Sequence, residues 1–383
     1  NALTRVARAL AFVDPDRCIA VCERAVEASR AHGDPLLEAR AEMLSACWRI
    51  VTNGWRREDA EICAAARDRI QSLSDELPAY YEILYAHVQC IQGDYEGACE
   101  TARAGIPKSV ENDSLVVYLS AHSSLAHALL HLGRWGEMRE VVRRALAIAE
   151  KNGNAPWEAI FKAVLAWLHY HAFDMAGAGT RCAKLLEAHD EEPAGQVRTM
   201  AMVIGGFTVL DSDEAEALRR FTAVGERQLR PRFFLDWYWR ILARLGLSRV
   251  YLGRGEVKEA RREAALVREA ACAGADPVLQ GLAWESQAQI DAAAGDLDRA
   301  MESLQHALRT LKPFASPLAA WRVHSTASQL YAAAGETALA EDHRERAAAV
   351  LRRLADSLSA GDPLRGSVLK APAVRPLADR ASS

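Results

Sequence analysis

The sequence lacks the features that define several common classes of protein. No apolar run approaches the roughly 20 residues that a membrane-spanning helix needs, and nothing at the start resembles a signal peptide. Period-two alternation and Asn-Gly hairpin turns are absent, so there is no strand signal. The net charge is only −4 over 383 residues, which argues against a nucleic-acid surface made by the whole protein. We therefore expect neither a membrane nor a nucleic acid as partner.

Motifs of catalysis and metal binding are also missing. The sequence has no Gly-x-x-x-x-Gly-Lys-[Ser/Thr] phosphate loop, no His-Glu-x-x-His and no Gly-x-Ser-x-Gly. Its eight cysteines form no C-x-x-C pair, which is typical of free thiols in a reducing compartment. His127 and His131 could share a metal on one helix face, but no third ligand lies near them in the sequence. We expect no enzyme site, no cofactor and no metal, and we expect a cytoplasmic protein.

What the sequence does contain is a repeat with a period of roughly 40 residues. Four turns share a glycine, an acidic residue after it and an alanine five positions beyond the glycine; they begin at Gly93, Gly255, Gly295 and Gly335. The alanine position can be followed through the chain as Ala20, Ala60, Ala98, Met138, Ala178, Ala217, Ala260, Ala300 and Ala340. These positions run from 20 to 340 in eight nearly equal intervals, and they predict nine structural units.

Two further patterns divide each unit into a pair of helices. Seven positions before the turn stands a small residue, which lets two helices approach closely; Trp48 breaks the pattern in the second unit. The small residues are Ala86, Ala126, Ala166, Gly205, Ser248, Ala288 and Ser328. Prolines mark the starts of the first helices, because the first helical turn does not need their missing N–H. They are Pro35, Pro78, Pro156, Pro193, Pro231, Pro277 and Pro317.

Short polar residues are predicted to cap the first helices. Asp34, Asp276 and Ser316 each precede one of the prolines, and Asp113 takes this place in the unit that has no such proline. The side-chain oxygen of such a residue accepts a hydrogen bond from a free backbone N–H of the first turn. Together with the turns and the missing strand signal, these helix starts predict an all-α chain.

This pattern resembles the tetratricopeptide repeat, which combines a small residue in the first helix, a glycine at the turn and an alanine in the second helix over about 34 residues. The resemblance implies an all-α, right-handed α-solenoid of about nine helix-turn-helix units over residues 1–358, each lengthened to about 40 residues. Armadillo and HEAT repeats, which have a similar period, are the structural alternative. We expect residues 359–383 to form a tail that is extended or mobile.

In tetratricopeptide stacks the first helices line the concave surface, and the residue after the small crossing residue faces the groove. Here that column is mainly polar or aromatic, whereas a column facing the core should be aliphatic. The candidate binding residues in and around it are Arg49, His87, His127, Trp167, Tyr170, Arg249, Glu285, Gln289, Arg322 and Gln329. The alternative is a solvated surface without a ligand. Residues 233–239 hold the densest group of aromatic rings, which we expect to pack between units; an exposed docking patch is the alternative.

The last sixty residues carry a more particular resemblance. Segments 315–324, 351–355 and 361–369 look like the C-terminal repeat region of large bacterial signalling ATPases of the AAA or STAND type. In those proteins an ATPase module lies upstream, often with a nucleotide cyclase, a protein kinase or a DNA-binding domain. The chain lacks an initial methionine, so we expect it to be part of a longer protein.

The resemblance implies a regulatory or sensor module that binds a protein or peptide, including other domains of the same polypeptide, in its concave groove. One alternative is an inducer-sensing domain of a transcriptional activator, with a small-molecule pocket near Trp167, Tyr170 and Met202. A closed superhelix would favour this alternative, and a shallow open groove would count against it. A second alternative is a structural or dimerisation arm.

Overall fold

The computed structural model describes residues 2–10, 14–74, 77–111, 114–188, 195–225, 233–314 and 316–371. These residues form nineteen α-helices, and within the described ranges there is no strand. The prediction of an all-α chain is therefore confirmed. In the same ranges, no helix combines the length and the apolar character that crossing a lipid bilayer would require.

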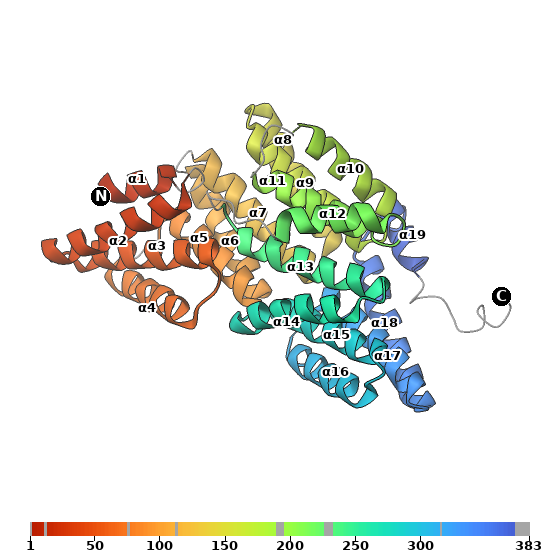
Figure 1. Cartoon of the computed structure of the whole chain (residues 1–383). Coiled ribbons are helices and arrows are strands. Elements are labelled where there is room, and N and C mark those ends of the chain that lie inside the picture. The colour runs from red at the N-terminus through yellow and green to blue at the C-terminus, as the bar shows by residue number, and fades with distance from the viewer. Residues whose placement is uncertain are drawn as a thin grey trace.

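The helices follow one another as antiparallel pairs, each made of a first and a second helix (Figure 1). The pairs are α1 (Ala2–Leu10) with α2 (Pro15–His32), α3 (Pro35–Asn53) with α4 (Arg57–Leu73), α5 (Ala79–Gln92) with α6 (Tyr95–Glu111), α7 (Leu115–His131) with α8 (Trp135–Lys151), α9 (Ala155–His171) with α10 (Met175–Ala188), α11 (Gln196–Val209) with α12 (Glu214–Gly225), α13 (Asp236–Gly253) with α14 (Val257–Ala273), α15 (Pro277–Ala293) with α16 (Leu297–Leu311), and α17 (Pro317–Ala333) with α18 (Thr337–Asp356). A short helix, α19 (Pro363–Leu369), follows the ninth pair.

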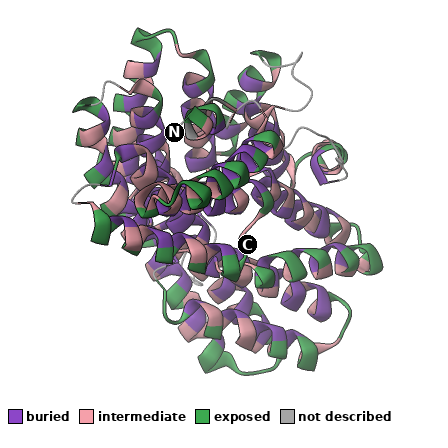
Figure 2. Ribbon diagram, turned by 90° about the vertical axis from the view of Figure 1, so that its left-hand side faces the viewer, coloured by how far each residue is buried: buried purple, intermediate pink, exposed green. Residues whose placement is uncertain are grey.

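The predicted repeat agrees with these pairs. Each of the nine repeat positions lies on the second helix of its unit, and from Ala98 to Ala340 every one of them is buried. Buried positions run along the sides of helices that face one another, and exposed positions lie on outer faces and turns (Figure 2). Two helices cannot bury an apolar face alone, so neighbouring units must stack into a solenoid.

The register of the first two units differs from the prediction. Ala20 is exposed and Ala60 is only partly buried. In the second unit, Gly54 ends α3 with φ +100° and takes the place of the turn glycine. Counted from Gly54, the small crossing residue is Cys47 and the repeat position is Asp59, both of which are buried. The alignment through Trp48 was wrong by one residue, because this turn lacks the usual acidic residue and alanine.

Most of the predicted helix starts are confirmed. The carboxylate of Asp34 accepts hydrogen bonds from two backbone N–H groups of α3, both at 3.0 Å, and Asp276 accepts one from Val278 at 2.9 Å. Ser316 stands at the predicted N-cap position of α17, but its hydroxyl makes no capping hydrogen bond with the described residues. Pro193, Pro231 and Asp113 lie outside the described residues.

The solenoid closes on itself, because residues of the early turns pack against the starts of much later helices. Three pairs of residues show this contact: Val51 with Leu235, Gly93 with Pro277, and Gly133 with Pro317. The two residues of each pair are separated by the same number of positions in the sequence, from 51 to 235, from 93 to 277 and from 133 to 317. The N–H of Leu235 donates to the carbonyl of Val51 over 3.0 Å. The contacts recur after between four and five units, which defines one turn of the superhelix. We call this line of contacts the seam.

Glycine is required at the seam for two reasons. Gly93 has φ +77°, in the left-handed region that residues with a Cβ seldom adopt. A Cβ at Gly93 would also overlap with Cδ of Pro277. The turn glycine therefore lets the backbone of one superhelical turn approach the helix start of the next turn closely.

The chain beyond α18 packs against the early part of the solenoid. Leu364 and Val368 of α19 are buried in the main core, and Asp362 pairs with Arg139 of α8. Residues 363–369 are thus helical, which differs from the expected extended or mobile tail. The physical reason is that Asp362 caps this helix, accepting a hydrogen bond from Leu364 N at 3.0 Å, while two apolar side chains anchor it. Residues 372–383 lie outside the described part of the chain.

Candidate ligand pocket

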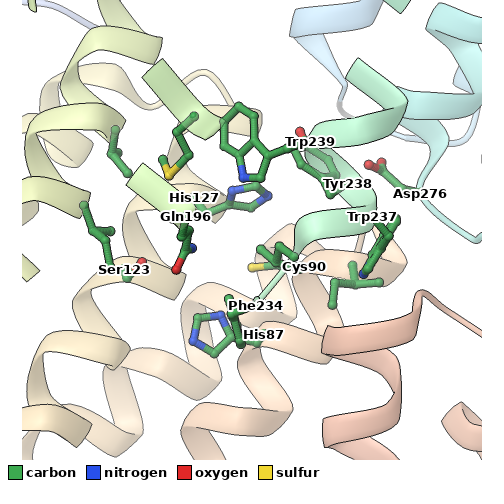
Figure 3. Close-up of a pocket in the computed structure, with 15 residues that line it drawn as sticks. His87, Cys90, Ser123, His127, Gln196, Phe234, Trp237, Tyr238, Trp239 and Asp276 are labelled. Atoms are coloured by element: carbon green, nitrogen blue, oxygen red, sulfur yellow. The ribbon is translucent and has the colours of Figure 1, made fainter. Parts of the chain in front are cut away.

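A pocket lies inside the superhelix, between successive first helices and the aromatic segment that begins α13. The cavity itself has a volume of about 60 Å³, which holds only a few water molecules, so a larger ligand must move side chains of the wall apart. Its walls are formed by His87, Cys90, Ile91, Ser123, His127, Ile160, Val164, Gln196, Met200, Phe234, Leu235, Trp237, Tyr238, Trp239 and Asp276 (Figure 3). We call it the inner pocket.

The fold brings these residues together from two superhelical turns. α5, α7, α9 and α11 supply one wall, and residues 234–239 with the start of α15 supply the other. Leu235 has φ +61° and donates its N–H to Val51. This left-handed residue turns the chain just before α13, so that the rings around it point into the pocket and onto the seam. Phe234, Tyr238 and Trp239 are buried, as the predicted packing role requires, whereas Trp237 is only partly buried.

Three polar side chains on the pocket wall lack partners. The imidazole of His127, the amide of Gln196 and the hydroxyl of Ser123 make no hydrogen bond with any of the described residues, yet none of the three side chains is sealed from the pocket. A polar group in an apolar site is costly unless it finds a partner. These groups can therefore hold a ligand in one orientation by hydrogen bonding.

The other polar groups near the pocket are already satisfied. The two ring nitrogens of His87 face the hydroxyls of Ser120 and Ser124, at 3.1 and 2.9 Å. Burial lowers the pKa of His87 to about 3, so the ring is neutral at physiological pH. His87 was predicted to be a binding residue; the structure places its ring in the pocket wall, packed edge-on against Phe234 with centroids 4.8 Å apart.

His131 fixes the position of two aromatic neighbours of the pocket. Its Nδ1 lies 2.9 Å from the carbonyl of His127 and must carry the proton, so Nε2 accepts from the hydroxyl of Tyr238, 3.4 Å away. The ring stacks on Tyr95, with centroids 4.7 Å apart. Burial lowers the pKa of His131 to about 4, and burial also holds the pKa of His127 well below its usual value. Neither ring is charged near pH 7.

Asp276 is the one acidic residue of the pocket wall, and no lysine or arginine is among the lining residues that the structure describes. Its Oδ1 accepts hydrogen bonds from the hydroxyl of Tyr95, at 2.8 Å across the seam, and from Val278 N. Burial is the largest influence and raises the pKa of Asp276 to about 6, although these hydrogen bonds act in the opposite direction. The pocket is thus neutral to negative, and it disfavours an anionic ligand.

Six of the predicted site residues form a second cluster farther along the interior. They are Trp167, Tyr170, Arg249, Glu285, Gln289 and Arg322. This cluster adjoins the inner pocket, because the ring of Trp167 lies 5.9 Å from that of Trp239 and stacks on Tyr170 at 5.0 Å. Met202, which was predicted to line a pocket with Trp167 and Tyr170, is not on the wall of the inner pocket; Met200 is.

Charges in the second cluster are held by partners inside the protein. Glu285 is 2% exposed and accepts a hydrogen bond from Gln289 at 2.6 Å. The guanidinium of Arg249 lies 3.6 Å from the same carboxylate, and Arg322 donates to the hydroxyl of Tyr170 at 2.9 Å. Burial lowers the pKa of Arg322, and the nearby Arg249 adds to this effect. The cluster therefore ties α9, α13, α15 and α17 together.

Two predicted site residues lie apart from the rest. Nε of Arg49 is 2.6 Å from Asp59, and its Nη1 is 2.6 Å from Ser45, so this side chain joins α3 to α4. The one-residue shift in the second unit explains this, because the position after the crossing residue is Trp48, whose ring lies 6.3 Å from Phe234. Gln329 is exposed near the end of α17 and is not brought to the pocket.

The sequence patterns missed several residues of the pocket. Gln196 and Met200 lie one turn or more before the groove column on α11, where no motif marks them. Asp276 was recognised only as a helix cap, because its contact with Tyr95 spans 181 positions. The sequence did indicate the aromatic segment, but local spacing could not show that this segment lies opposite α5 and α7.

Metal binding has no support in the geometry. The rings of His127 and His131 are tilted against each other with centroids 4.3 Å apart, and one nitrogen of His131 is bonded to a backbone carbonyl. Across the described ranges, no group of three or more His, Cys, Asp or Glu side chains is arranged to hold a metal ion.

Comparisons with known proteins support the fold. No protein-family model matches the chain, and no curated protein matches it either. Among solved structures, a tetratricopeptide repeat protein from Parabacteroides merdae ATCC 43184 matches with 17% identity and a TM-score of 0.38, over 76% of this chain and 98% of that one. The chain is also similar to NprR in complex with its cognate peptide NprX, with 11% identity and a TM-score of 0.52, over 86% of this chain and 97% of that one. The likeness to NprR, together with the nine helical pairs, supports an α-solenoid fold built from tetratricopeptide-like units.

Proposed function

We propose that this chain is a regulatory module, without enzyme activity of its own, that binds a small and largely apolar ligand in the inner pocket. The observation that carries the proposal is a wall of aromatic rings with three unsatisfied hydrogen-bonding groups, on His127, Gln196 and Ser123, among the described residues. These three side chains are only partly buried, so their hydrogen-bonding groups can be reached by a ligand that enters the pocket.

The chemistry of the wall limits the kind of ligand. With neutral histidines and a single carboxyl group at Asp276, the pocket accepts neutral or cationic molecules. Tryptophan and tyrosine rings favour a flat or cationic apolar body. Because the solenoid is closed along the seam, a small molecule fits the interior better than a folded partner does. The inducer-sensing alternative called for a closed superhelix, but it placed the pocket near Trp167, Tyr170 and Met202, which do not line the inner pocket.

A second candidate ligand is a short peptide. The chain shares its fold with NprR, whose structure was solved in complex with a cognate peptide. An extended peptide would need to lie along the interior from the inner pocket to the second cluster, past Trp239 and Trp167. In that case Arg249 and Arg322, which outnumber Glu285, offer donors for a carboxylate. A peptide whose affinity depends on these arginines would favour this candidate over the small molecule.

The predicted binding residues take different roles in this proposal. His127 contacts the ligand through its free ring nitrogens, and His87 contributes the edge of its ring. Trp167 packs against Trp239 of the pocket wall, and the rest of the second cluster holds Trp167 in place. Arg49 and Gln329 do not contact the ligand, and Gln329 therefore serves as a control position.

The neutral fluorescent dye prodan provides a direct test of the pocket. We expect prodan to bind the wild-type chain with a rise in emission. Ser123→Phe fills the pocket and should weaken binding more than tenfold, while Gln196→Leu removes one hydrogen bond, worth about 1 kcal/mol or roughly fivefold in affinity. Gln329→Leu is the matched control and should bind prodan like the wild type. Equal affinity in all variants, with unchanged circular dichroism, would show that the pocket is not the binding site.

The wider context is a separate part of the proposal. The resemblance of the last repeats to those of bacterial signalling ATPases suggests that ligand binding regulates other domains of a longer cytoplasmic protein. All eight cysteines are free thiols, which suits a reducing compartment. The full reading frame of the gene tests this, because it would reveal an ATPase, cyclase, kinase or DNA-binding domain beside the solenoid. Light scattering tests the dimerisation alternative, which requires a dimer in solution.

A further inference from the structure

A second hollow lies on the outside of the seam, where the turn after α3 meets α13 and α14. It is an open groove with about 1500 Å³ of space that is continuous with solvent. Its lining consists of Asn53, Gly54, Trp55, Arg56, Arg57, Trp237, Arg240, Ile241, Arg244, Leu266, Glu269, Ala270, Ala273 and Gly274. We call it the arginine groove.

The groove is positively charged although the chain is not. Four arginines and one glutamate line it, which gives the lining a formal charge of +3 in a chain whose net charge is −4. Two carboxylates just outside the lining reduce this to +1. Arg240 pairs with Asp236 and Arg244 pairs with Glu263. Arg56 and Arg57 are exposed and have no acidic partner among the described residues. These two guanidinium groups remain available to a carboxylate from outside.

Apolar surface lies next to the two free arginines. The ring of Trp237 packs on Gly54, where a Cβ would lie 3.6 Å from the indole, and thereby forms the floor of the groove. Leu266, on the opposite side, is 39% exposed. The indole N–H groups of Trp55 and Trp237 are buried and donate no hydrogen bond within the described part of the chain.

We propose that the arginine groove docks an acidic peptide segment of a partner protein that also carries large apolar side chains. Its carboxylates pair with Arg56 and Arg57, and its apolar side chains cover Leu266 and Trp237. A nucleic acid fits less well, since duplex binding uses about 6–10 phosphate contacts and this groove has two unpaired cations. The proposal does not depend on a ligand in the inner pocket.

The test uses a short fluorescein-labelled peptide in which glutamates alternate with leucine and phenylalanine, measured by fluorescence anisotropy. We expect binding that weakens as salt is added, because exposed charges are screened. The variant Arg56→Glu/Arg57→Glu should bind roughly tenfold more weakly, since two ion pairs become repulsive contacts. Leu266→Ser should weaken binding several-fold without changing its dependence on salt.

Matched controls distinguish this site from general charge attraction. The variant Arg24→Glu/Arg352→Glu makes the same change in charge at two exposed arginines that lie outside the groove, and it should bind like the wild type. A peptide with lysine in place of glutamate should not bind. The proposal is overturned if the control variant loses as much affinity as the groove variant, if the groove variant binds normally, or if a single-stranded oligonucleotide binds more tightly than the peptide with the same dependence on Arg56 and Arg57.

Discussion

Replacing Asp276 with asparagine should stabilise the protein at neutral pH. The carboxyl group is 5% exposed and lies at the seam, where it accepts hydrogen bonds from Tyr95 and from Val278 N. Asparagine keeps an oxygen that accepts both bonds and is nearly as good a helix cap as aspartate. The substitution therefore removes the buried negative charge and leaves the local geometry in place.

The magnitude follows from the pKa of this group. Burial raises the pKa of Asp276 from its ordinary value of 3.8 to about 6, and each pH unit corresponds to about 1.4 kcal/mol. Holding the carboxylate ionised in the folded state thus costs about 3 kcal/mol. The new amide adds a buried N–H without a partner, which costs about 1 kcal/mol. We expect Asp276→Asn to gain about 2 kcal/mol near pH 7.5.

The gain in stability from Asp276→Asn should depend on pH, and the direction of this dependence follows from the raised pKa. Since the folded state binds this proton more tightly than the unfolded state does, the cost is fully present above pH 6 and disappears as the pH falls toward 3.8. The advantage of Asp276→Asn should therefore shrink between pH 6 and pH 4. The measurement is urea unfolding followed by tryptophan fluorescence at several pH values. Because solenoids can unfold in segments, hydrogen exchange of the first turn of α15 provides a local measurement.

Asp296→Asn is the matched control for this experiment. Asp296 caps α16 in the same way, accepting a hydrogen bond from Arg299 N at 3.1 Å, but its side chain is exposed. We expect little change in stability from this control at any pH. The reasoning about Asp276 would be refuted if Asp276→Asn were less stable than the wild type at pH 7.5, or if its advantage did not change with pH.

Three further predictions test the packing of the solenoid. Gly93→Ala should lower the urea midpoint much more than Gly295→Ala, because both glycines have a left-handed φ but only Gly93 also lacks room for a Cβ; equal effects would contradict the seam. Arg49→Met should cost about 3 kcal/mol, because the buried carboxylate of Asp59 is left without its partner, and it should leave prodan affinity unchanged. Phe221→Ala should cost about 3–5 kcal/mol in unfolding experiments, since this fully buried ring fills the core; a cost below about 1 kcal/mol would contradict its packing.

Local patterns predicted the units of the fold because the signals that define a helical pair lie within one unit. Asp34 and Asp276 cap helices through bonds to the next two or three residues, and Gly93 ends a helix through its own φ. Such interactions do not depend on distant parts of the chain. Where the local signal was weak the prediction failed, as in the second unit, where Trp48 was placed one position out of register.

The candidate site was predicted less completely, because its walls come from distant parts of the sequence. His127 lines the inner pocket, but Gln196 was not recognised, and Arg49 pairs with Asp59 inside its own unit instead of lining the pocket. The small rotation of each unit against the next decides which residues meet. Rotation errors accumulate over several units, so a repeat register alone does not tell which side chains face each other across the interior.

The sequence by itself determined the nine helical pairs and most of their turns, together with the caps at Asp34 and Asp276, since these rest on contacts within a single unit. Only the tertiary structure decided that the solenoid closes after between four and five units, that Pro277 packs on Gly93, and that the aromatic segment of α13 lies opposite α5 and α7. The physical reason is that closure depends on the summed geometry of successive units, and the same closure that creates the seam also encloses the inner pocket.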